Sequence, residues 1–205
     1  MTKNKLTPSD LLIKLLYTKL VNKDFKPYEF LIEFKEDTCT VTTINNSHTA
    51  ILKIIIRNFE TDRQGAYKIA LKDMLKSDYT AHLVDKNTLE NNALTKFDDL
   101  LFNEEAYVEC PYCEFEKYLN LDYRYICLDI CGRKSLYNIG LLKSVIYDDI
   151  YDYITGLSAS IPGNDAPLIL RYDWGDDFTV YGIVAPLIDD PLTKADIICR
   201  LPFKW

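Results

Sequence analysis

The sequence has little of what nucleotide-binding enzymes, hydrolases and membrane proteins need. It contains only seven glycines in 205 residues, and it has no P-loop, no G-x-G-x-x-G fingerprint and no G-x-S-x-G elbow. No apolar run approaches the ~18 residues of a membrane-spanning helix, and the N-terminal segment lacks the apolar centre of a signal peptide. We therefore expect a soluble, intracellular protein that is not an enzyme and has no membrane partner.

A basic excess is also missing. The chain carries 31 acidic and 24 basic residues, a formal net charge of -7, which argues against a protein that binds nucleic acid through its overall charge. A local basic face is compatible with this balance, because net charge governs solubility and not fold. Apolar residues make up 48% of the chain, enough for a real core, and its 15 tyrosines and nine phenylalanines suit β-strands.

Local patterns predict one helix and then a series of strands in the first half. Thr7 and Pro8 are typical of a helix start, and this helix should end before Pro27. Polar turn residues separate the apolar runs that follow. We expect strands over 28–34, 38–43, 50–57, 66–69 and 79–85, a short helical piece over 71–76, and a helix or a loop over 87–103.

The C-terminal third combines a helix with a hairpin. Apolar residues repeat at helical spacing from Ile139 to Tyr153. The segment 175–177 is typical of a turn that joins strands over 168–172 and 178–184. We expect the carboxylates of the helix on its solvated face and not in a catalytic site: Asp148, Asp149 and Asp152.

Four of the six cysteines form two closely spaced pairs. A C-x2-C pair, in which a proline helps to fix the turn, precedes a C-x3-C pair that is followed by Gly132. Clustered cysteines in an intracellular chain bind metal more often than they form disulfides, and four thiolates leave no open position for a substrate. The pattern predicts a structural zinc ribbon with the ligands Cys110, Cys113, Cys127 and Cys131.

The alternative for the second pair is a plain β-strand over 125–131. Cys127 and Cys131 would then lie ~13 Å apart along the strand, too far to share one ion through bonds of ~2.3 Å. Zinc binding therefore requires a turn between them. Cys39 and Cys199 are interpreted as a core thiol and a thiol of the tail.

The end of the chain resembles the last repeat of PCNA-type DNA sliding clamps. Residues 135–190 read SLYNIGLLKSVIYDDIYDYITGLSASIPGNDAPLILRYDWGDDFTVYGIVAPLIDD. A helical run is followed by three strand runs, and the last closes on the Ala-Pro-x-Ile ending of residues 185–188.

The first part of the chain resembles the same family. INNSHTAILKIII is similar to the family's first repeat, in which a Met-Asp-x-Ser-His segment precedes a strand of alternating apolar residues. Ser47 and His48 match that segment, whereas Ile44 and Asn45 depart from its Met-Asp pair. KIALKDMLK, residues 68–76, resembles the start of the second repeat.

The resemblance implies an α+β fold of DNA-clamp (processivity fold) repeats, each a helix plus antiparallel strands, with an inserted zinc ribbon. We expect the chain to be divided into N-terminal clamp-like repeats over 1–106, a zinc-ribbon-like insertion over 107–133, a C-terminal clamp-like repeat over 134–190 and a tail over 191–205. A middle portion of the family's chain is expected to be missing, because 205 residues are few for a clamp subunit.

The resemblance also implies a function and a set of sites. Several copies would form a ring that encircles double-stranded DNA without reading its sequence and tethers a DNA polymerase or other replication or transcription proteins. The lysines expected to face DNA are Lys14, Lys19, Lys23, Lys72, Lys76 and Lys143. The family's pocket for partner peptides corresponds to His48, Pro167, Ala185, Pro186 and Ile188.

Two other hypotheses stay open. A clamp-fold adaptor that does not encircle DNA, such as a late-transcription factor with a structural zinc ribbon, would fit the acidic last helix. A zinc-ribbon protein with accidental similarity to clamps is the third reading. The altered family pattern suggests a viral or otherwise divergent origin, with the nucleus or the cytoplasm as the place of action depending on the host.

Overall fold

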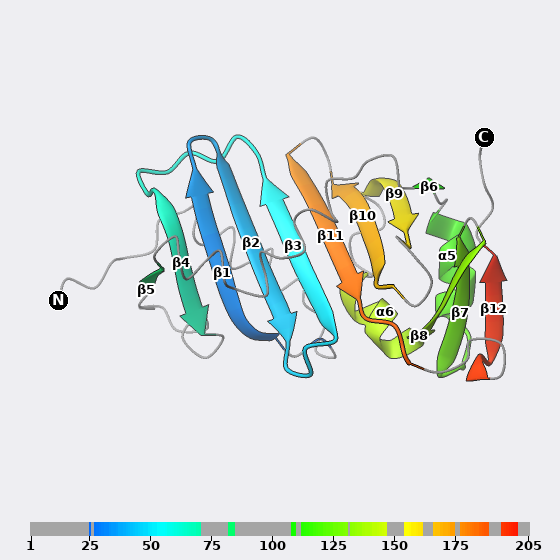
Figure 1. The fold of residues 1–205 in the computed structure, drawn as a ribbon. Helices are drawn as coiled ribbons and strands as arrows, with labels where there is room; N and C mark the ends of the chain where they lie inside the picture. The colour runs from blue at the N-terminus through cyan, green and yellow to red at the C-terminus, as the bar shows by residue number, and fades with distance from the viewer. Residues whose placement is uncertain are drawn as a thin grey trace.

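The computed structural model describes residues 25, 27–70, 82–84, 108–109, 112–130, 132–146, 154–161, 166–174, 177–188 and 194–200. In these ranges the chain forms a nine-stranded sheet and a three-stranded sheet, shown side by side in Figure 1. The helical piece over 71–76 and the segment 87–103 lie outside the described residues, as does the expected helix over 7–25 apart from Phe25. No described helix is long and apolar enough to cross a membrane.

The first half of the nine-stranded sheet is an antiparallel meander. Its strands are β1 (Pro27–Lys35), β2 (Thr38–Asn45), β3 (Ala50–Ile56), β4 (Gly65–Ala70) and β5 (His82–Val84). β1 pairs with both β2 and β4, and β2 pairs with β3. The expected strands match the observed ones because their apolar runs are separated by strong turn formers. The exception is the strand expected over 79–85. Only its residues 82–84 are described, and they form β5.

The second half of this sheet comes from the end of the chain. β9 (Ile154–Ser160), β10 (Leu168–Trp174) and β11 (Phe178–Val184) form an antiparallel meander, and β6 (Val108–Glu109) pairs with β9 at the sheet edge. The hairpin expected around 175–177 is confirmed by the pairing of Trp174 with Phe178. β11 pairs with β3 from Ala50↔Val184 to Ile56↔Phe178, and this pairing joins the two halves.

The smaller sheet has the strand order β12–β7–β8. β7 (Tyr125–Ile130) and β8 (Arg133–Asn138) form a hairpin, and β12 (Ile197–Arg200) adds to β7 in parallel. Gly132 lies in the hairpin turn with φ +76, a conformation that favours glycine. Residues 191–205 were expected to form a tail, and the strand β12 within them was not predicted.

Two short helices accompany these sheets. α5 (Tyr112–Leu119) precedes β7, and α6 (Ile139–Val145) follows β8. The Asn138 side chain caps α6 by accepting a hydrogen bond from the Leu141 amide at 3.3 Å. The expected apolar stripe was longer than the observed helix, because Ile146 already has extended backbone angles. Residues 147–153, with Asp148, Asp149 and Asp152, lie outside the described residues.

The nine-stranded sheet is buried on both faces. Along β3, Leu52 belongs to the main core and its neighbour Ile51 to a second cluster on the opposite face, as the alternation of side chains in a strand requires. The main core also includes Leu142 of α6 and Leu128 of β7. This face of the large sheet is therefore the one that faces α6 and the small sheet.

Candidate partner-binding surface

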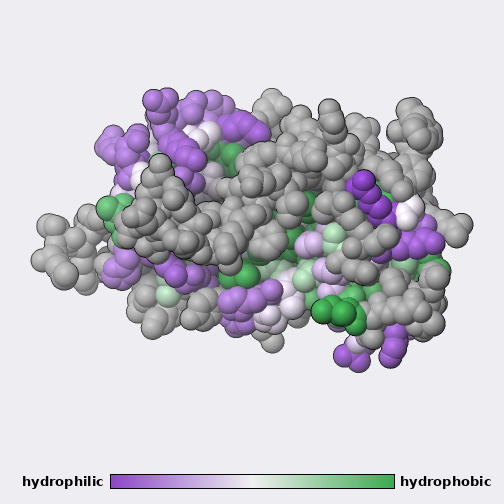
Figure 2. Space-filling model, in the orientation of Figure 1, coloured by the Kyte–Doolittle hydropathy of each residue, from purple (hydrophilic) through white to green (hydrophobic). Residues whose placement is uncertain are grey.

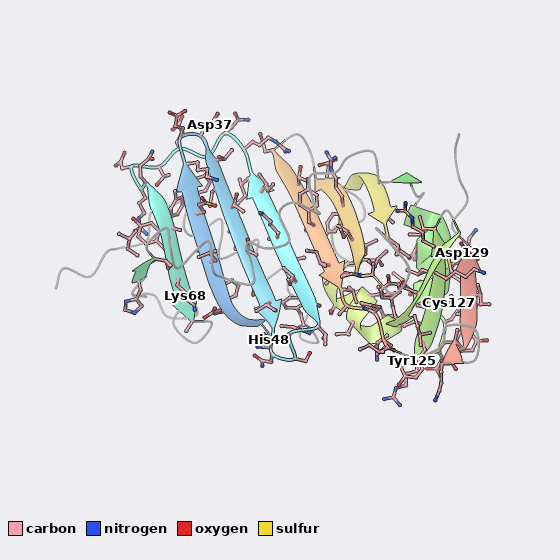
Figure 3. The ribbon with its side chains drawn as sticks, viewed as in Figure 1. Asp37, His48, Lys68, Tyr125, Cys127 and Asp129 are labelled. Carbon is pink, nitrogen blue, oxygen red and sulfur yellow. The ribbon has the colours of Figure 1, made fainter. Side chains whose placement is uncertain are left out.

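The connection between β2 and β3 is a tight polar loop, residues 46–49. The amide of His48 donates to the Asn45 carbonyl at 2.9 Å, and His48 has φ 57, a left-handed conformation that is uncommon for a residue with a Cβ atom. The His48 side chain is exposed, and Figure 3 shows it at the end of the hairpin. The loop therefore holds His48 in a strained conformation that its surroundings must support.

Asn45 supplies that support from inside the loop. Its side-chain oxygen accepts from the amides of Thr49 at 2.8 Å and Ala50 at 3.0 Å. Its side-chain nitrogen donates to the hydroxyls of Ser47 at 3.0 Å and Thr49 at 3.1 Å. Only 3% of Asn45 is exposed. In the sequence, Asn45 is only a departure from the family's pattern. In the structure, its side chain binds the far end of the loop at Thr49 and Ala50.

The segment that follows β11 meets this loop. The amide of Ala185 donates to the Thr49 carbonyl at 2.8 Å, which extends the pairing of β11 with β3 by one residue. Further along, the Leu187 amide donates to the Leu136 carbonyl of β8 at 2.8 Å. These two bonds fix both ends of the segment 185–187. The next side chain, Ile188, is fully exposed at 100%.

Pro167 reaches the same place from a third segment. Leu168, the first residue of β10, pairs with Val184, so Pro167 and Ala185 are neighbours beyond the paired strands. Both are partly buried. The structure thus places the loop of His48, Pro167 and Ala185 at the same end of the neighbouring strands β3, β10 and β11, and Pro186 and Ile188 follow Ala185 along the chain.

This surface is apolar where it meets solvent. Figure 2 shows hydrophobic colour on the molecular surface at lower right, in the region where Figure 1 places the chain that follows β11. Ile188 is one of four large hydrophobic residues in the described ranges that are notably exposed, with Leu83, Tyr123 and Ile198.

The lysines expected to face DNA are mostly outside the described residues. Lys14, Lys19, Lys23, Lys72 and Lys76 lie there. Lys143 is described in the last turn of α6 and is partly buried. The apolar side of this helix is buried, which directs the helix onto the sheet. Of the six lysines expected to face DNA, Lys143 alone lies in the described residues.

The four expected zinc ligands are only partly described. Cys110 and Cys131 lie outside the described residues, and Cys113 is known only as a backbone position in α5. Cys127 lies inside β7, fully buried, and Figure 3 labels it in the small sheet. Burial, and then the nearby Asp129, raises the pKa of the Cys127 thiol, with Lys134 acting in the opposite direction.

Cys127 lies in a plain β-strand, which is the alternative to zinc binding that the sequence left open. β7 continues through Ile130 without a turn. Within the described ranges, no group of three or more His, Cys, Asp or Glu residues is placed to hold a metal ion. The thiols of Cys39 and Cys199 are buried and are not part of a disulfide. Cys39 is the core thiol that was expected, whereas Cys199 belongs to β12 and not to a loose tail.

Comparisons with known proteins define the class of fold. No protein-family model matches the sequence, and no curated protein matches it significantly. Among solved structures, the chain is similar to one of the C-terminal region of FEN-1 bound to A. fulgidus PCNA, with a TM-score of 0.56, 13% identity, and 89% of this chain and 97% of that chain covered. This protein has the fold of PCNA-like sliding clamps.

A second solved structure extends the comparison. The chain is also similar to one in the PCNA2–PCNA3 complex from Sulfolobus tokodaii, with a TM-score of 0.58, 10% identity, and 88% of this chain and 97% of that chain covered. The expectation of a clamp fold from the residues at both ends of the chain is thereby confirmed. The similarity spans nearly the whole of each clamp chain and is not confined to the first and last repeats.

Proposed function

We propose that this protein is a sliding-clamp-like processivity factor that tethers a DNA polymerase or other replication proteins to double-stranded DNA. The observation that carries the proposal is the surface formed by His48, Pro167 and residues 185–188 on a PCNA-like fold. A. fulgidus PCNA binds the C-terminal region of FEN-1. By the same logic, we infer that this surface takes a peptide segment of a replication protein.

The proposal includes assembly of several copies. The S. tokodaii structure is a complex of two PCNA chains, and a ring of several copies would surround DNA and stay on it while sliding. The phosphate contacts would come from lysines on helices, which act without base readout. Lys143 of α6 is the described candidate, and the other five lysines belong to the same proposal.

The test is primer extension on a primed single-stranded DNA circle with the replicative polymerase from the same source. We expect longer products in the presence of the protein, and a gain that falls as salt is raised because phosphate contacts are salt-dependent. No gain in product length at any salt concentration would rule out the processivity role. A clamp-fold adaptor would then remain.

A charge placed at Ile188 should weaken the effect of the protein on product length. Ile188→Glu changes a side chain that is 100% exposed, so folding should be unaffected, whereas burial of the new carboxylate against a partner is unfavourable. We expect the protein concentration that gives half of the gain to rise about tenfold or more. Circular dichroism should match that of the unsubstituted protein.

The matched control is Leu83→Glu. Leu83 is an exposed apolar side chain on the edge strand β5, which β4, β1 and β2 separate from β3 and the proposed surface. This variant should retain the full gain in product length. Equal losses in both variants would show that the effect is general and would contradict a docking role for Ile188.

We also propose, from the sequence pattern alone, that the cysteine pairs bind a structural zinc ion. Metal analysis of the purified protein should give one zinc per chain, and Cys110→Ser together with Cys113→Ser should remove it because two thiolate ligands are lost. Cys39→Ser is the control, since Cys39 lies in the core of the large sheet. Zinc content that is unchanged by the double substitution would refute the ribbon.

A further inference from the structure

β8 binds two of the segments that form the proposed surface. The Tyr137 hydroxyl donates to the Ala166 carbonyl at 2.8 Å, and Ala166 directly precedes Pro167. The carbonyl of the neighbouring Leu136 accepts from the Leu187 amide at 2.8 Å. Figure 1 shows the chain that follows β11 running past β8. Two successive residues of one strand therefore hold two separate parts of that surface.

β8 is a firm base for these bonds. It pairs with β7 over its whole length, from Arg133↔Ile130 to Asn138↔Tyr125. Tyr137 is fully buried and belongs to the main core. Close packing around a buried ring leaves it little freedom to move. The Tyr137 hydroxyl therefore has a fixed place from which it reaches Ala166.

Ala166 and Pro167 lie beyond the ladders of β10. That strand pairs with β9 from Ile169 and with β11 from Leu168, and a proline has no amide hydrogen to add to a ladder. Ala166 packs against the main core from a partly buried position. The bond from Tyr137 therefore holds a part of the chain that the pairing of β10 does not include.

β8 also binds the other side of the connection from β9 to β10. The Arg133 guanidinium donates from Nη1 to the Ile161 carbonyl at 3.0 Å. Arg133 and Tyr137 lie four residues apart and so share one face of the strand. The chain is thus bound by one face of β8 where it leaves β9 and again where it approaches β10.

The position of the Ala166 carbonyl gives this bond a consequence for Pro167. The carbonyl belongs to the peptide group that contains the proline nitrogen, and this group is planar. A bond that fixes the direction of the carbonyl therefore fixes the plane of that nitrogen. The proline ring is closed on the same nitrogen, which restricts its φ angle. The Tyr137 hydroxyl thereby sets the direction in which the ring points.

We propose that Tyr137 is a positioning residue of the proposed surface, because its hydroxyl orients the Ala166–Pro167 peptide group and with it the proline ring that a bound peptide meets. This inference rests on the proposed function. Without the hydroxyl, only a fraction of the protein holds the ring in the competent direction, and the apparent affinity falls by that fraction. The bound state itself is unchanged.

The first measurement is primer extension with Tyr137→Phe, which keeps the ring and removes the hydroxyl. The protein concentration that gives half of the gain in product length should rise about threefold to tenfold, the range that one hydrogen bond between neutral groups allows. The gain at saturating concentration should be unchanged. An unchanged half-gain concentration would overturn the proposal, and so would a Tyr137→Phe protein that does not fold, because the hydroxyl would then be structural.

Tyr172→Phe is the matched control. Tyr172 is also fully buried, and its hydroxyl donates to a backbone carbonyl, that of Val145 at the end of α6, at 3.3 Å. The same group is removed from the same core, away from the Ala166–Pro167 peptide group. This variant should keep the half-gain concentration of the unsubstituted protein. Equal rises in both variants would mean a general loosening of the core and would contradict the proposal.

Pro167→Ala tests whether Tyr137 acts through the proline. With the ring absent, Tyr137→Phe should have no further effect on the half-gain concentration, because two residues that act as a unit are not additive. A purely structural role of Tyr137 would give factors that multiply in the double variant. That result would show that Tyr137 does not act through Pro167, and the proposal would be wrong.

The last measurement needs neither DNA nor a polymerase. NMR of the protein with isotope-labelled proline reports on each proline ring, and the signals of Pro167 are those that Pro167→Ala removes. They should shift or broaden in Tyr137→Phe and stay in place in Tyr172→Phe. Unchanged Pro167 signals in Tyr137→Phe would refute the inference. If the unsubstituted protein gives no gain in product length, the proposed function has failed, and these signals alone decide whether Tyr137 orients the proline.

Discussion

Gly182→Ala is expected to lower the free energy of unfolding by about 1–3 kcal/mol. A Cβ atom at position 182 would lie 2.9 Å from Cβ and 3.0 Å from Cγ2 of Val145, at the end of α6. Such distances are too short, and Val145 is fully buried with no space to move. Alanine in place of a strand glycine is otherwise favourable. The contact with α6 therefore decides that the substitution lowers the free energy of unfolding.

Thermal unfolding checks this result, with a shift of about 2–4 °C per kcal/mol in a chain of this size. The matched variant is Gly182→Ala combined with Val145→Gly, which removes both side-chain atoms that clash, Cβ and Cγ2. The double variant should be more stable than additive effects of the two substitutions allow, because the residues are in contact. Additive losses would mean that α6 does not constrain position 182.

Asn45→Ala is expected to destabilise the protein by about 1–3 kcal/mol and to abolish the gain in product length. The Ala50 amide, which is buried, loses its acceptor, and an unsatisfied buried amide carries the full cost of desolvation. The Thr49 amide loses the same acceptor, and the hydroxyls of Ser47 and Thr49 lose the donor that Asn45 supplies. The loop that carries His48 at φ 57 is then held without any bond from the side chain at position 45.

Asn45→Asp is the control for this prediction. A carboxylate keeps an acceptor for the amides of Thr49 and Ala50, and the hydroxyls of Ser47 and Thr49 can donate to it. Stability, measured by denaturant unfolding, and product length should both stay close to those of the unsubstituted protein. If Asn45→Ala were as stable and as active as Asn45→Asp, the side chain would not organise the loop.

The strands of the large sheet could be predicted because their signals are local. Apolar runs such as 50–57, bounded by polar turns, match β3 within a residue. The small sheet was predicted poorly because the pairing that forms it has no local signal. Tyr125–Ile130 carries cysteines whose spacing is typical of metal binding, yet its residues are buried by strands on both sides, and nothing in the local sequence shows this pairing.

The site was predicted through resemblance and not through local chemistry. His48 and Pro167 have no motif of their own, and each alone is typical of a loop or strand end. Their meeting with Ala185 depends on the pairing of β3 with β11 and of β10 with β11. Asn45, which organises the loop, was missed because its role depends on burial and on four hydrogen bonds.

The sequence by itself determined the turns and most strands of the large sheet, because turn residues and the alternation of apolar residues act over a few positions. Its resemblance to sliding clamps predicted the class of fold. Tertiary structure alone decided that β11 joins β3, that Asn45 supports His48, and that the end of the chain covers β7. The first and the third rest on backbone hydrogen bonds between distant segments, and the second rests on the burial of the Asn45 side chain and its bonds within the loop. Backbone groups are the same in every residue, so the sequence carries no local record of which strand they bind.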